Sequence, residues 1–416
     1  MIQKPKGTLD YINKDGYMYN YLYNYTMNFM HAYNYDFIKT PTFESTDLFY
    51  RGVGKTTDVV NKETYDFVDK GDRKMTLRPE FTAGVVRSYI ENKMYTDEVK
   101  KLYYYGSAFR YERPQSGRLR EFTQMGVEVF GVKNPNMDAE VISLAYKYLS
   151  GLGIENLHVV LNTLGDNESR NNYNKVIKEY LEKDKDNLCE ICKERLNKNP
   201  LRILDCKYDS EREYIKNAPK TVDYLNEESK SYYEAVKSSL DLLDIPYVED
   251  PTLVRGLDYY THTVFEIKSD LDFLGKANTI CAGGRYDNLV KTLGGPDTPG
   301  IGFAAGIERI MTIMNELETY IPQEKLDIFI MNLEDSGYAY QVLDDLRSSG
   351  YSCEIDYTGK SMKGMWKLVD KYNPNYVLII GEDEVKGNYI TVKDNTTKES
   401  IQVKSNELME YLDMNF

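Results

Sequence analysis

The sequence predicts an α+β main body, with an antiparallel sheet flanked by helices and a helical insertion, followed by a C-terminal α/β domain. Short β-like runs alternate with charged loops over residues 36–130 and return at 263–267, as expected for consecutive strands of one sheet. Between them, residues 166–246 follow a helical pattern rich in Asn, Lys and Glu. Beyond residue 325, strands alternate with helices, as in βαβ units.

These elements divide the chain into two parts. The main body covers 1–321 and is interrupted by the insertion at 166–246, and a linker containing Pro322 separates it from a domain at 325–416. In that domain the pattern predicts strands at 326–333, 353–357 and 376–380, helices at 336–349 and from 361 onward, and two further short strands.

The first helix is predicted over residues 17–35, which are rich in tyrosine. Its aromatic residues recur at i, i+4 spacing and are expected to face the core. They are Tyr21, Tyr25, Phe29 and Tyr33.

Length and composition limit the classes that the chain can belong to. At about 150 residues per domain, 416 residues suggest two or three domains, and a hydrophobic content of 41% excludes a wholly disordered chain. No apolar run approaches the roughly 20 residues that span a bilayer, and the first residues lack the apolar region of a signal peptide. Five scattered cysteines argue against a disulfide framework, so a cytoplasmic location is expected.

The net charge and the histidine content argue against several classes of function. A net charge of −14 argues against a sequence-blind nucleic-acid coat but allows a nucleic-acid partner met through local basic patches. Only three histidines are present, which argues against a His-rich metal site or a His-centred triad.

An arginine-rich loop at 109–122 is the densest chemical signal. Pro114 and the pair Ser116-Gly117 place a turn between two strand-like arms. Arginine can bind phosphate through two parallel hydrogen bonds, so this loop suits a phosphate ligand, whereas a solvated charged hairpin is the alternative for the loop taken alone. Its arginines are Arg110, Arg113, Arg118 and Arg120.

Three later runs combine glycine with charged or phenolic residues. Residues 253–261 place Arg255 before paired tyrosines, which suits a pocket wall, with a buried ion pair of Arg255 with Asp258 or another acid as the alternative. Residues 281–287 and 300–309 contain glycines that allow a ligand close to the backbone. The last run is not a dinucleotide fingerprint, because its spacing is G-x-G-x-x-x-G.

Taken together and in order, these segments resemble the histidyl-tRNA synthetase family of class II aminoacyl-tRNA synthetases. The resemblance covers nearly the whole chain. It is carried by the three class II signatures (Thr40-Pro41-Thr42-Phe43-Glu44, 109–128 and 300–309) and by three histidine-specific ones (Thr76-Leu77-Arg78-Pro79-Glu80, Arg255-Gly256-Leu257-Asp258-Tyr259-Tyr260 and Ala282-Gly283-Gly284-Arg285-Tyr286-Asp287).

The resemblance implies a catalytic domain at 1–321 that activates histidine with ATP and transfers it to tRNA. Arg110 and Arg255 are the implied catalytic residues, because both contact the α-phosphate in the family. ATP, arriving with Mg²⁺, is the implied nucleotide, and no tightly bound cofactor is expected. The implied ATP-binding residues are Arg110, Glu112, Phe122 and Arg309.

Histidine selection is a hydrogen-bonding problem, because an imidazole presents two ring nitrogens. The resemblance assigns the ring to Glu128 and Tyr260 and the ammonium group to Glu80, Thr82 and Gln124. The full implied set for histidine is Glu80, Thr82, Gln124, Glu128, Arg255, Tyr259 and Tyr260.

The remaining implied partners are tRNA(His) and a second copy of the chain. Arg113 and Gln115 correspond to residues that reach the tRNA acceptor end, and the first signature implies a homodimer. The domain at 325–416 is implied to bind the anticodon, although it holds ten basic and sixteen acidic side chains. A stripe of lysines at helical spacing is the candidate backbone contact, with ordinary solvated lysines as the alternative: Lys360, Lys363, Lys367 and Lys371.

The sequence departs from the family pattern at one position, and two rival functions remain. Phe81 occupies a position where many family members have glycine, so it could reshape the amino-group pocket. Histidyl-synthetase-like regulatory subunits of ATP phosphoribosyltransferase resemble the same body, but they usually lack the C-terminal domain and have eroded arginine motifs. A tRNA-binding paralogue without activation is the other rival.

The insertion contains three cysteines, Cys189, Cys192 and Cys206, in a run that is similar to family insertions. They raise the question of zinc, but the sequence shows no evident fourth ligand. Free thiols are therefore favoured, and no metal site is expected.

Overall fold

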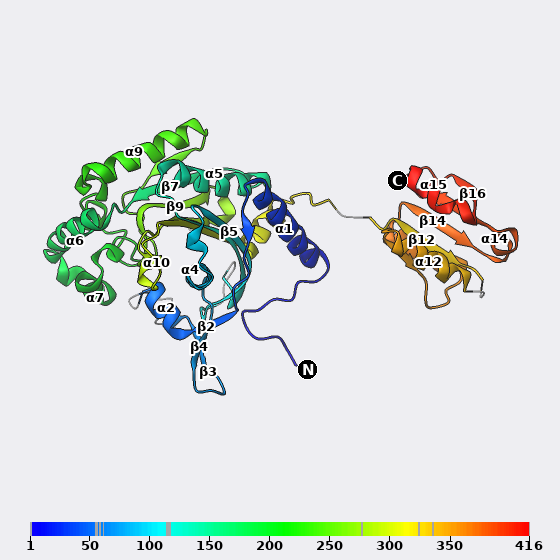
Figure 1. Cartoon of the computed structure of the whole chain (residues 1–416), viewed down its shortest axis with the longest axis horizontal. Coiled ribbons are helices and arrows are strands. Elements are labelled where there is room, and N and C mark those ends of the chain that lie inside the picture. The colour runs from blue at the N-terminus through cyan, green and yellow to red at the C-terminus, as the bar shows by residue number, and fades with distance from the viewer. Residues whose placement is uncertain are drawn as a thin grey trace. The chain divides into compact units, whose positions relative to one another are not determined.

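The computed structural model describes residues 2–54, 57, 60, 62–113, 118–275, 278–322, 325–334 and 337–415. The chain forms two compact units, Met1–Tyr320 and Ile321–Phe416 (Figure 1). Each unit has its own sheet. No helix of the described residues is both long and apolar enough to cross a membrane.

The first unit is built on an eight-stranded sheet. Its inner six strands run antiparallel to one another, as the sequence predicts. The two edge strands instead run parallel to theirs, so the sheet is mixed. In sheet order the strands are β1 (Asp36–Phe37), β5 (Lys100–Phe109), β6 (Glu121–Phe130), β11 (Gly300–Gly306), β10 (Thr279–Arg285), β9 (Thr261–Ser269), β7 (Leu157–Thr163) and β8 (Tyr247–Glu249).

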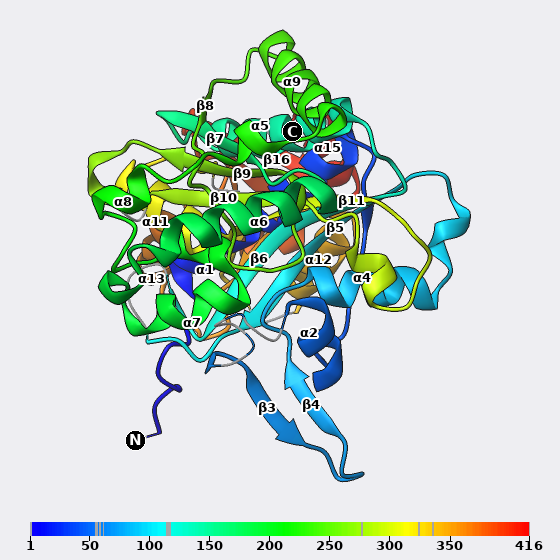
Figure 2. The same ribbon diagram turned by 90° about the vertical axis from the view of Figure 1, so that its left-hand side faces the viewer.

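Helices pack around this sheet (Figures 1 and 2). Helix α5 (Pro135–Gly151) contacts several central strands. It begins after Asn134, whose side chain accepts a hydrogen bond from the backbone of Asn136 and so satisfies one of the unpaired amides of the first turn. The other helices of this body are α1 (Asn13–Ala32), α2 (Thr46–Gly52), α4 (Thr82–Glu91), η1 (Met94–Thr96), η5 (Asp272–Leu274), α10 (Leu289–Thr292) and α11 (Ile307–Glu316).

The aromatic stripe predicted for the first helix does not form the buried face of α1. Instead, the buried residues are Met18, Leu22, Thr26 and Met30. The rings of Tyr21, Tyr25, Phe29 and Tyr33 follow one another at 5.3–6.2 Å beside that face and are half-buried. Tyrosine pairs an apolar ring with a hydroxyl that stays hydrated at an edge, whereas the unbranched and aliphatic side chains fill the core.

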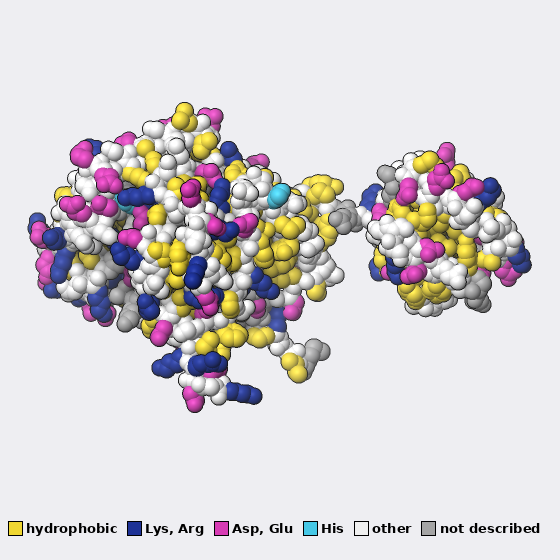
Figure 3. Space-filling view, viewed as in Figure 1, with side chains coloured by type: hydrophobic (Ala, Val, Ile, Leu, Met, Phe, Trp, Pro, Cys, Tyr) yellow, Lys and Arg dark blue, Asp and Glu magenta, His cyan; other side chains and the backbone are white. Residues whose placement is uncertain are grey.

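A small three-stranded sheet projects from the body near α2 (Figure 2). Its strand order is β2 (Phe43–Ser45), β4 (Lys74–Leu77) and β3 (Tyr65–Val68), all antiparallel. Exposed basic residues gather at its tip, which is dark blue in Figure 3: Lys70, Arg73 and Lys74.

The segment 166–246 is helical. Asp166 and Asn226 each cap a helix by accepting a backbone hydrogen bond three residues later, from Ser169 and Ser229. The elements are α6 (Asn167–Glu182), η2 (Lys185–Asn187), α7 (Glu190–Lys198), η3 (Pro200–Ile203), α8 (Glu213–Lys216), η4 (Thr221–Tyr224) and α9 (Glu227–Leu242).

The second unit is a small α/β domain, as the strand–helix alternation predicts. Three parallel strands are extended by two antiparallel ones in the order β13, β12, β14, β15, β16. The strands are β12 (Ile328–Asn332), β13 (Cys353–Ile355), β14 (Tyr376–Ile380), β15 (Tyr389–Asp394) and β16 (Ser400–Lys404). The helices are α12 (Tyr338–Ser348), α13 (Met362–Tyr372), α14 (Glu382–Gly387), η6 (Ser405–Glu407) and α15 (Leu408–Asn415).

Candidate active site

One pocket of the first unit collects side chains from segments far apart in the chain. Strands β6, β10 and β11, which are neighbours at the centre of the large sheet, contribute to its lining. The start of α4 and the loop at 255–260 also line it, and its empty space is about 730 Å³, including the open mouth. Of the residues that the sequence assigned to a site, it brings together Glu80, Thr82, Arg110, Gln124, Glu128, Arg255, Tyr259 and Tyr260.

Glu128 lies on β6 and is buried in this pocket. Its carboxylate accepts hydrogen bonds from the Thr82 hydroxyl (2.7 Å) and from the Tyr286 hydroxyl. Gly302 on β11 faces Glu128 across the ladder, and a Cβ there would collide with the carboxylate, so glycine is required at this position. Burial raises the pKa of Glu128 to about 8.

Glu80 is a second buried carboxylate in the same pocket. Its two oxygens accept the backbone N–H groups of Thr82 (2.7 Å) and Ala83 (2.8 Å) at the start of α4. Burial raises its pKa, while these amides and the charge of Arg110 act in the opposite direction. A carboxylate offers about four lone-pair positions, so Glu80 can still accept hydrogen bonds from a ligand.

Arg110 extends from the end of β5 toward the carboxylates. Its Nε donates to the carbonyl oxygen of Pro79 at 2.9 Å, which fixes the side chain beside Glu80. Its guanidinium carbon lies 5.4 Å from the centre of the Phe122 ring on β6. Phe122 does not line the pocket itself, but it contacts Arg110, which does.

Arg255 lines the pocket from the opposite loop and forms an ion pair with Glu266 on β9. The other oxygen of Glu266 accepts a hydrogen bond from Thr279 at 2.9 Å. The Nε of Arg255 is buried without a hydrogen-bond partner among the described residues. The ion pair that the sequence offered as an alternative is therefore present with another acid, Glu266, whereas Asp258 accepts a hydrogen bond from Asn199.

The two tyrosines of this loop form an aromatic wall of the pocket. The ring centres of Tyr259 and Tyr260 lie 4.8 Å apart, and that of Tyr259 lies 5.6 Å from that of Tyr286. The helical segment supports the loop from behind, because Arg170 on α6 donates to the carbonyl oxygens of Asp258 (3.2 Å) and Tyr260 (2.9 Å).

Gln124 supplies an unsatisfied acceptor. Its Oε1 is buried and has no hydrogen-bond partner among the described residues. An unpaired buried acceptor is costly, at about 1–3 kcal/mol, and a ligand N–H can offset that cost.

The remaining predicted residues lie outside the pocket lining. Arg309 on α11 donates to the carbonyl oxygen of Thr279 (3.1 Å), which does line the pocket. Burial and the nearby charge of Arg118 lower the pKa of Arg309. Glu112 pairs with Arg118 at 3.3 Å. Arg113 is exposed in the same loop, and Gln115 lies outside the described residues.

Phe81, the departure noted in the sequence, is fully buried at the pocket wall. Its ring stacks on Tyr104 at 4.3 Å with an interplanar angle of 3°, and the guanidinium carbon of Arg78 lies 4.0 Å from its centre. Arg78 also donates to the carbonyl oxygen of Thr40 at 2.8 Å. The bulky ring thus takes part in a stack that joins the pocket to the first signature.

Sequence reasoning missed three residues that line the pocket, Tyr104, Tyr286 and Thr279, and one behind it, Glu266. Tyr286 and Tyr104 place phenol groups near Glu128, while Glu266 pairs with Arg255 and accepts a hydrogen bond from Thr279. Tyr286 stood within a quoted motif, but no role was assigned to it.

Two family models match most of the chain. A family model described as histidyl-tRNA synthetase matches residues 9–310, and one described as an anticodon binding domain matches 327–415. A histidine–tRNA ligase of Macrococcus caseolyticus is 47% identical over 416 residues, covering 99% of each chain.

The chain belongs to the histidyl-tRNA synthetase family. Among solved structures, the apo histidyl-tRNA synthetase of Staphylococcus aureus has a TM-score of 0.86 at 42% identity, covering 99% of this chain and 100% of that one. A Bacillus halodurans structure titled ATP phosphoribosyltransferase regulatory subunit/histidyl-tRNA synthetase has a TM-score of 0.64 at 21% identity, covering 91% of this chain and 98% of that one. The latter likeness shows only a shared fold.

In this histidyl-tRNA synthetase family member, the second unit carries the lysine stripe on and beside α13. All four lysines are exposed, namely Lys360, Lys363, Lys367 and Lys371. Trp366 on the same helix is half-buried, and the Nζ of Lys393 lies 4.5 Å from its ring centre. This surface thus combines several cations with an aromatic ring, although Lys360 also pairs with Asp356 at 3.4 Å.

Proposed function

We propose that this protein is a histidine–tRNA ligase, which forms histidyl-adenylate and pyrophosphate from L-histidine and ATP and then transfers histidine to the 3′ end of tRNA(His). The observation that carries this proposal is one pocket in which two buried carboxylates, Glu80 and Glu128, lie with two guanidinium groups, Arg110 and Arg255. Carboxylates suit the amine and the ring of histidine, whereas guanidiniums suit its carboxylate and the phosphates of ATP.

The imidazole ring binds between Glu128 and Tyr260, with Tyr259 beside it. Glu128 accepts a ring N–H in its ionised form and donates to a ring nitrogen in its protonated form. Because burial raises its pKa to about 8, both forms are accessible near neutral pH. An apolar competitor leaves these buried groups unpaired, which is the basis of strong discrimination.

The ammonium group of histidine binds to Glu80, Thr82 and Gln124. Glu80 keeps lone pairs beyond the two that its backbone donors use. The buried, unpaired Oε1 of Gln124 gains a donor when the ammonium arrives. These three residues offer oxygen acceptors, as a cationic amine requires.

ATP binds on the arginine side of the pocket. Arg110 holds the α-phosphate, Phe122 lies beneath the adenine, Glu112 contacts its edge, and Arg309 holds the γ-phosphate side. The proximity of Arg118 to Arg309 supports the last role, because an anion relieves the repulsion between two neighbouring cations. Mg²⁺ enters as part of the ATP complex and screens its phosphate charge.

Arg255 aligns the two reactants from the opposite wall. Its guanidinium contacts both the histidine carboxylate and the α-phosphate, so the attacking oxygen and the phosphorus meet in a fixed orientation. Glu266 and Thr279 hold the side chain in place, and its buried Nε is available as a donor. Transfer to tRNA follows: a ribose hydroxyl attacks the activated carbonyl and forms an ester, the bond between the carbonyl carbon and the phosphate oxygen breaks, AMP leaves, and a phosphate oxygen accepts the hydroxyl proton.

The tRNA contacts two parts of the chain. Arg113 and Gln115 in the arginine loop reach the acceptor end, and the domain at 325–416 binds the anticodon. The exposed lysines of α13 contact the phosphate backbone.

The chain acts as a homodimer in the cytoplasm. Large apolar side chains are exposed around the first signature and α1, among them Phe43 (51%), Phe37 (48%) and Met27 (43%). Figure 3 shows hydrophobic side chains gathered over α1. An exposed apolar surface of this kind is typical of an interface between subunits.

An amino-acid-dependent exchange assay tests the proposal. Purified protein should exchange labelled pyrophosphate into ATP with L-histidine and with no other amino acid. Exchange with another amino acid refutes the specificity. Absence of exchange refutes the ligase and favours the regulatory subunit or the tRNA-binding paralogue, which tRNA affinity then separates.

A further inference from the structure

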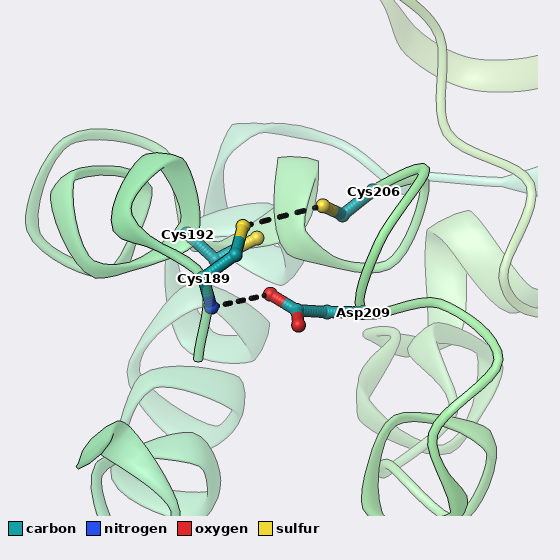
Figure 4. A group of neighbouring side chains, drawn as sticks. All are labelled: Cys189, Cys192, Cys206 and Asp209. Atoms are coloured by element: carbon teal, nitrogen blue, oxygen red, sulfur yellow. Dashed lines mark hydrogen bonds between the residues drawn. The ribbon is translucent and has the colours of Figure 1, made fainter. Parts of the chain in front are cut away.

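Four potential metal ligands meet in the helical segment, away from the pocket. Cys189 precedes α7, Cys192 lies in its first turn, and Cys206 and Asp209 follow η3. One ligand atom from each, three Sγ atoms and a carboxylate oxygen, all lie within 4.8 Å of one another. Figure 4 shows the four side chains converging from these two segments.

The spacing of these atoms fits tetrahedral coordination. Zn–S bonds of about 2.3 Å at the tetrahedral angle place two sulfur atoms about 3.8 Å apart. The Sγ atoms of Cys189 and Cys206 are 3.7 Å apart. A disulfide needs an S–S distance of about 2.0 Å, so this pair is not bonded and is already at the ligand–ligand distance.

Asp209 is the donor that the sequence did not reveal. Its side chain is fully buried, one oxygen accepts the backbone N–H of Cys189 at 2.9 Å, and the other lies 3.0 Å from the Nε of Arg212. A buried carboxylate is unfavourable unless a cation compensates it, and the single positive charge of Arg212 balances Asp209 alone.

We propose that Cys189, Cys192, Cys206 and Asp209 bind a structural Zn²⁺ ion. Three thiolates select zinc over the hard cations Mg²⁺ and Ca²⁺, and four protein ligands leave no open position for a substrate. Further groups support the ligands, since the backbone N–H of Tyr208 lies 3.5 Å from the Sγ of Cys206 and Arg212 orients the carboxylate. This replaces the sequence-based expectation of free thiols.

The ion would affect the pocket indirectly, by fixing the chain segment between its cysteine ligands. Residues 190–205 lie between the first and last cysteine ligands and include Asn199, whose Nδ2 donates to Asp258 at 2.8 Å. Asp258 directly precedes Tyr259 and Tyr260 of the pocket wall. Zinc therefore positions the wall that faces the histidine ring, without contacting it.

Metal analysis of the full-length chain tests the site directly. Protein purified without a metal-affinity tag and dialysed against metal-free buffer should retain about one zinc per chain, as a closed structural site does. Cys192→Ser and Cys206→Ser should lose it, whereas Cys353→Ser, a matched change at a buried cysteine of the other unit, should retain it.

A conservative variant keeps the site testable if the cysteine variants do not fold. Asp209→Asn keeps the shape of the side chain and should weaken zinc at least about tenfold, measured by competition with a chromogenic chelator. Chelation of the wild-type protein should lower its unfolding temperature more than it lowers that of Cys206→Ser.

Three results would overturn the site. Protein that is free of zinc as purified and yields five titratable thiols on denaturation would show free cysteines, and three titratable thiols would show a disulfide. Equal zinc in Cys206→Ser and Cys353→Ser would show adventitious metal only.

Discussion

Replacing Glu128 by Gln tests whether burial controls the protonation of the pocket. Burial raises the pKa of Glu128 to about 8 from an ordinary value of 4.5. Between these two pH values the native protein holds a proton that the unfolded chain has lost. Because the unfolded state binds fewer protons, the free energy of unfolding falls as pH rises through this window.

The magnitude follows from the two pKa values. Linkage gives a loss of about 2 to 3 kcal/mol between pH 5 and pH 7, and the loss stops growing above about pH 8, where both states are ionised. The Glu128→Gln variant has nearly the same shape and no titrating group at this position. Its pH profile therefore reports all other groups, and the difference between the two proteins isolates Glu128.

Urea unfolding at several pH values, followed by circular dichroism, measures this difference. The single tryptophan, Trp366, belongs to the second unit, so its fluorescence gives an internal control that should be the same in both proteins. Saturating L-histidine should flatten the wild-type profile, because a ring N–H or imidazolium stabilises the carboxylate and lowers its pKa. Parallel profiles of wild type and variant without ligand would refute the reasoning.

Four further changes have definite expected outcomes. Arg255→Ala should lower the rate of histidine-dependent exchange by about 100-fold or more, with Arg255→Lys intermediate because lysine lacks the planar fork. Asp138→Ala should lower the free energy of unfolding by about 3 kcal/mol in calorimetry, the low end for a broken buried pair, because Arg285 then keeps only Asp287 as an ion-pair partner. Phe43→Asp should convert a dimer to a monomer in sedimentation velocity. Removal of 325–416 should lower tRNA charging far more than exchange.

For each of these four predictions, one outcome would contradict the reasoning. A near-normal exchange rate in Arg255→Ala refutes its phosphate role, and unchanged stability in Asp138→Ala means that the ion pair contributes nothing net. A dimer that persists in Phe43→Asp moves the interface elsewhere. Equal losses of charging and exchange on removing 325–416 contradict a separate anticodon domain.

Most of the fold could be predicted because its strands and helices are long enough to show a period. The alternation in the second unit and the helical segment at 166–246 are examples. The two parallel edge strands were not predicted, since β1 and β8 have only two and three residues. The buried face of α1 was also missed, because tyrosine serves equally well in a core and at its edge.

The residues of the candidate site likewise include some that could be predicted from sequence and some that could not. Residues within recognisable motifs, such as Arg110 and Glu128, could be named from sequence, and the structure brings them to one pocket. Glu266 and Thr279 could not, because they lie on β9 and β10 and only the folded chain brings Glu266 to Arg255 and Thr279 to Glu266. Asp209 follows no spacing rule relative to the cysteines and becomes a ligand candidate only when the chain folds back on α7.

The two pocket carboxylates are not equivalent, and the difference suits the two nitrogen groups of histidine. Glu80 receives two backbone N–H groups at a helix start, which cannot reverse their direction and so favour the ionised form. Glu128 receives two hydroxyl groups, which can rotate to accept as well as donate. Glu80 is therefore suited to a permanent ammonium cation, and Glu128 to an imidazole whose ordinary pKa is about 6.5. The carboxyl and the ring can share one proton, so ring binding near neutral pH requires little exchange of protons with solvent.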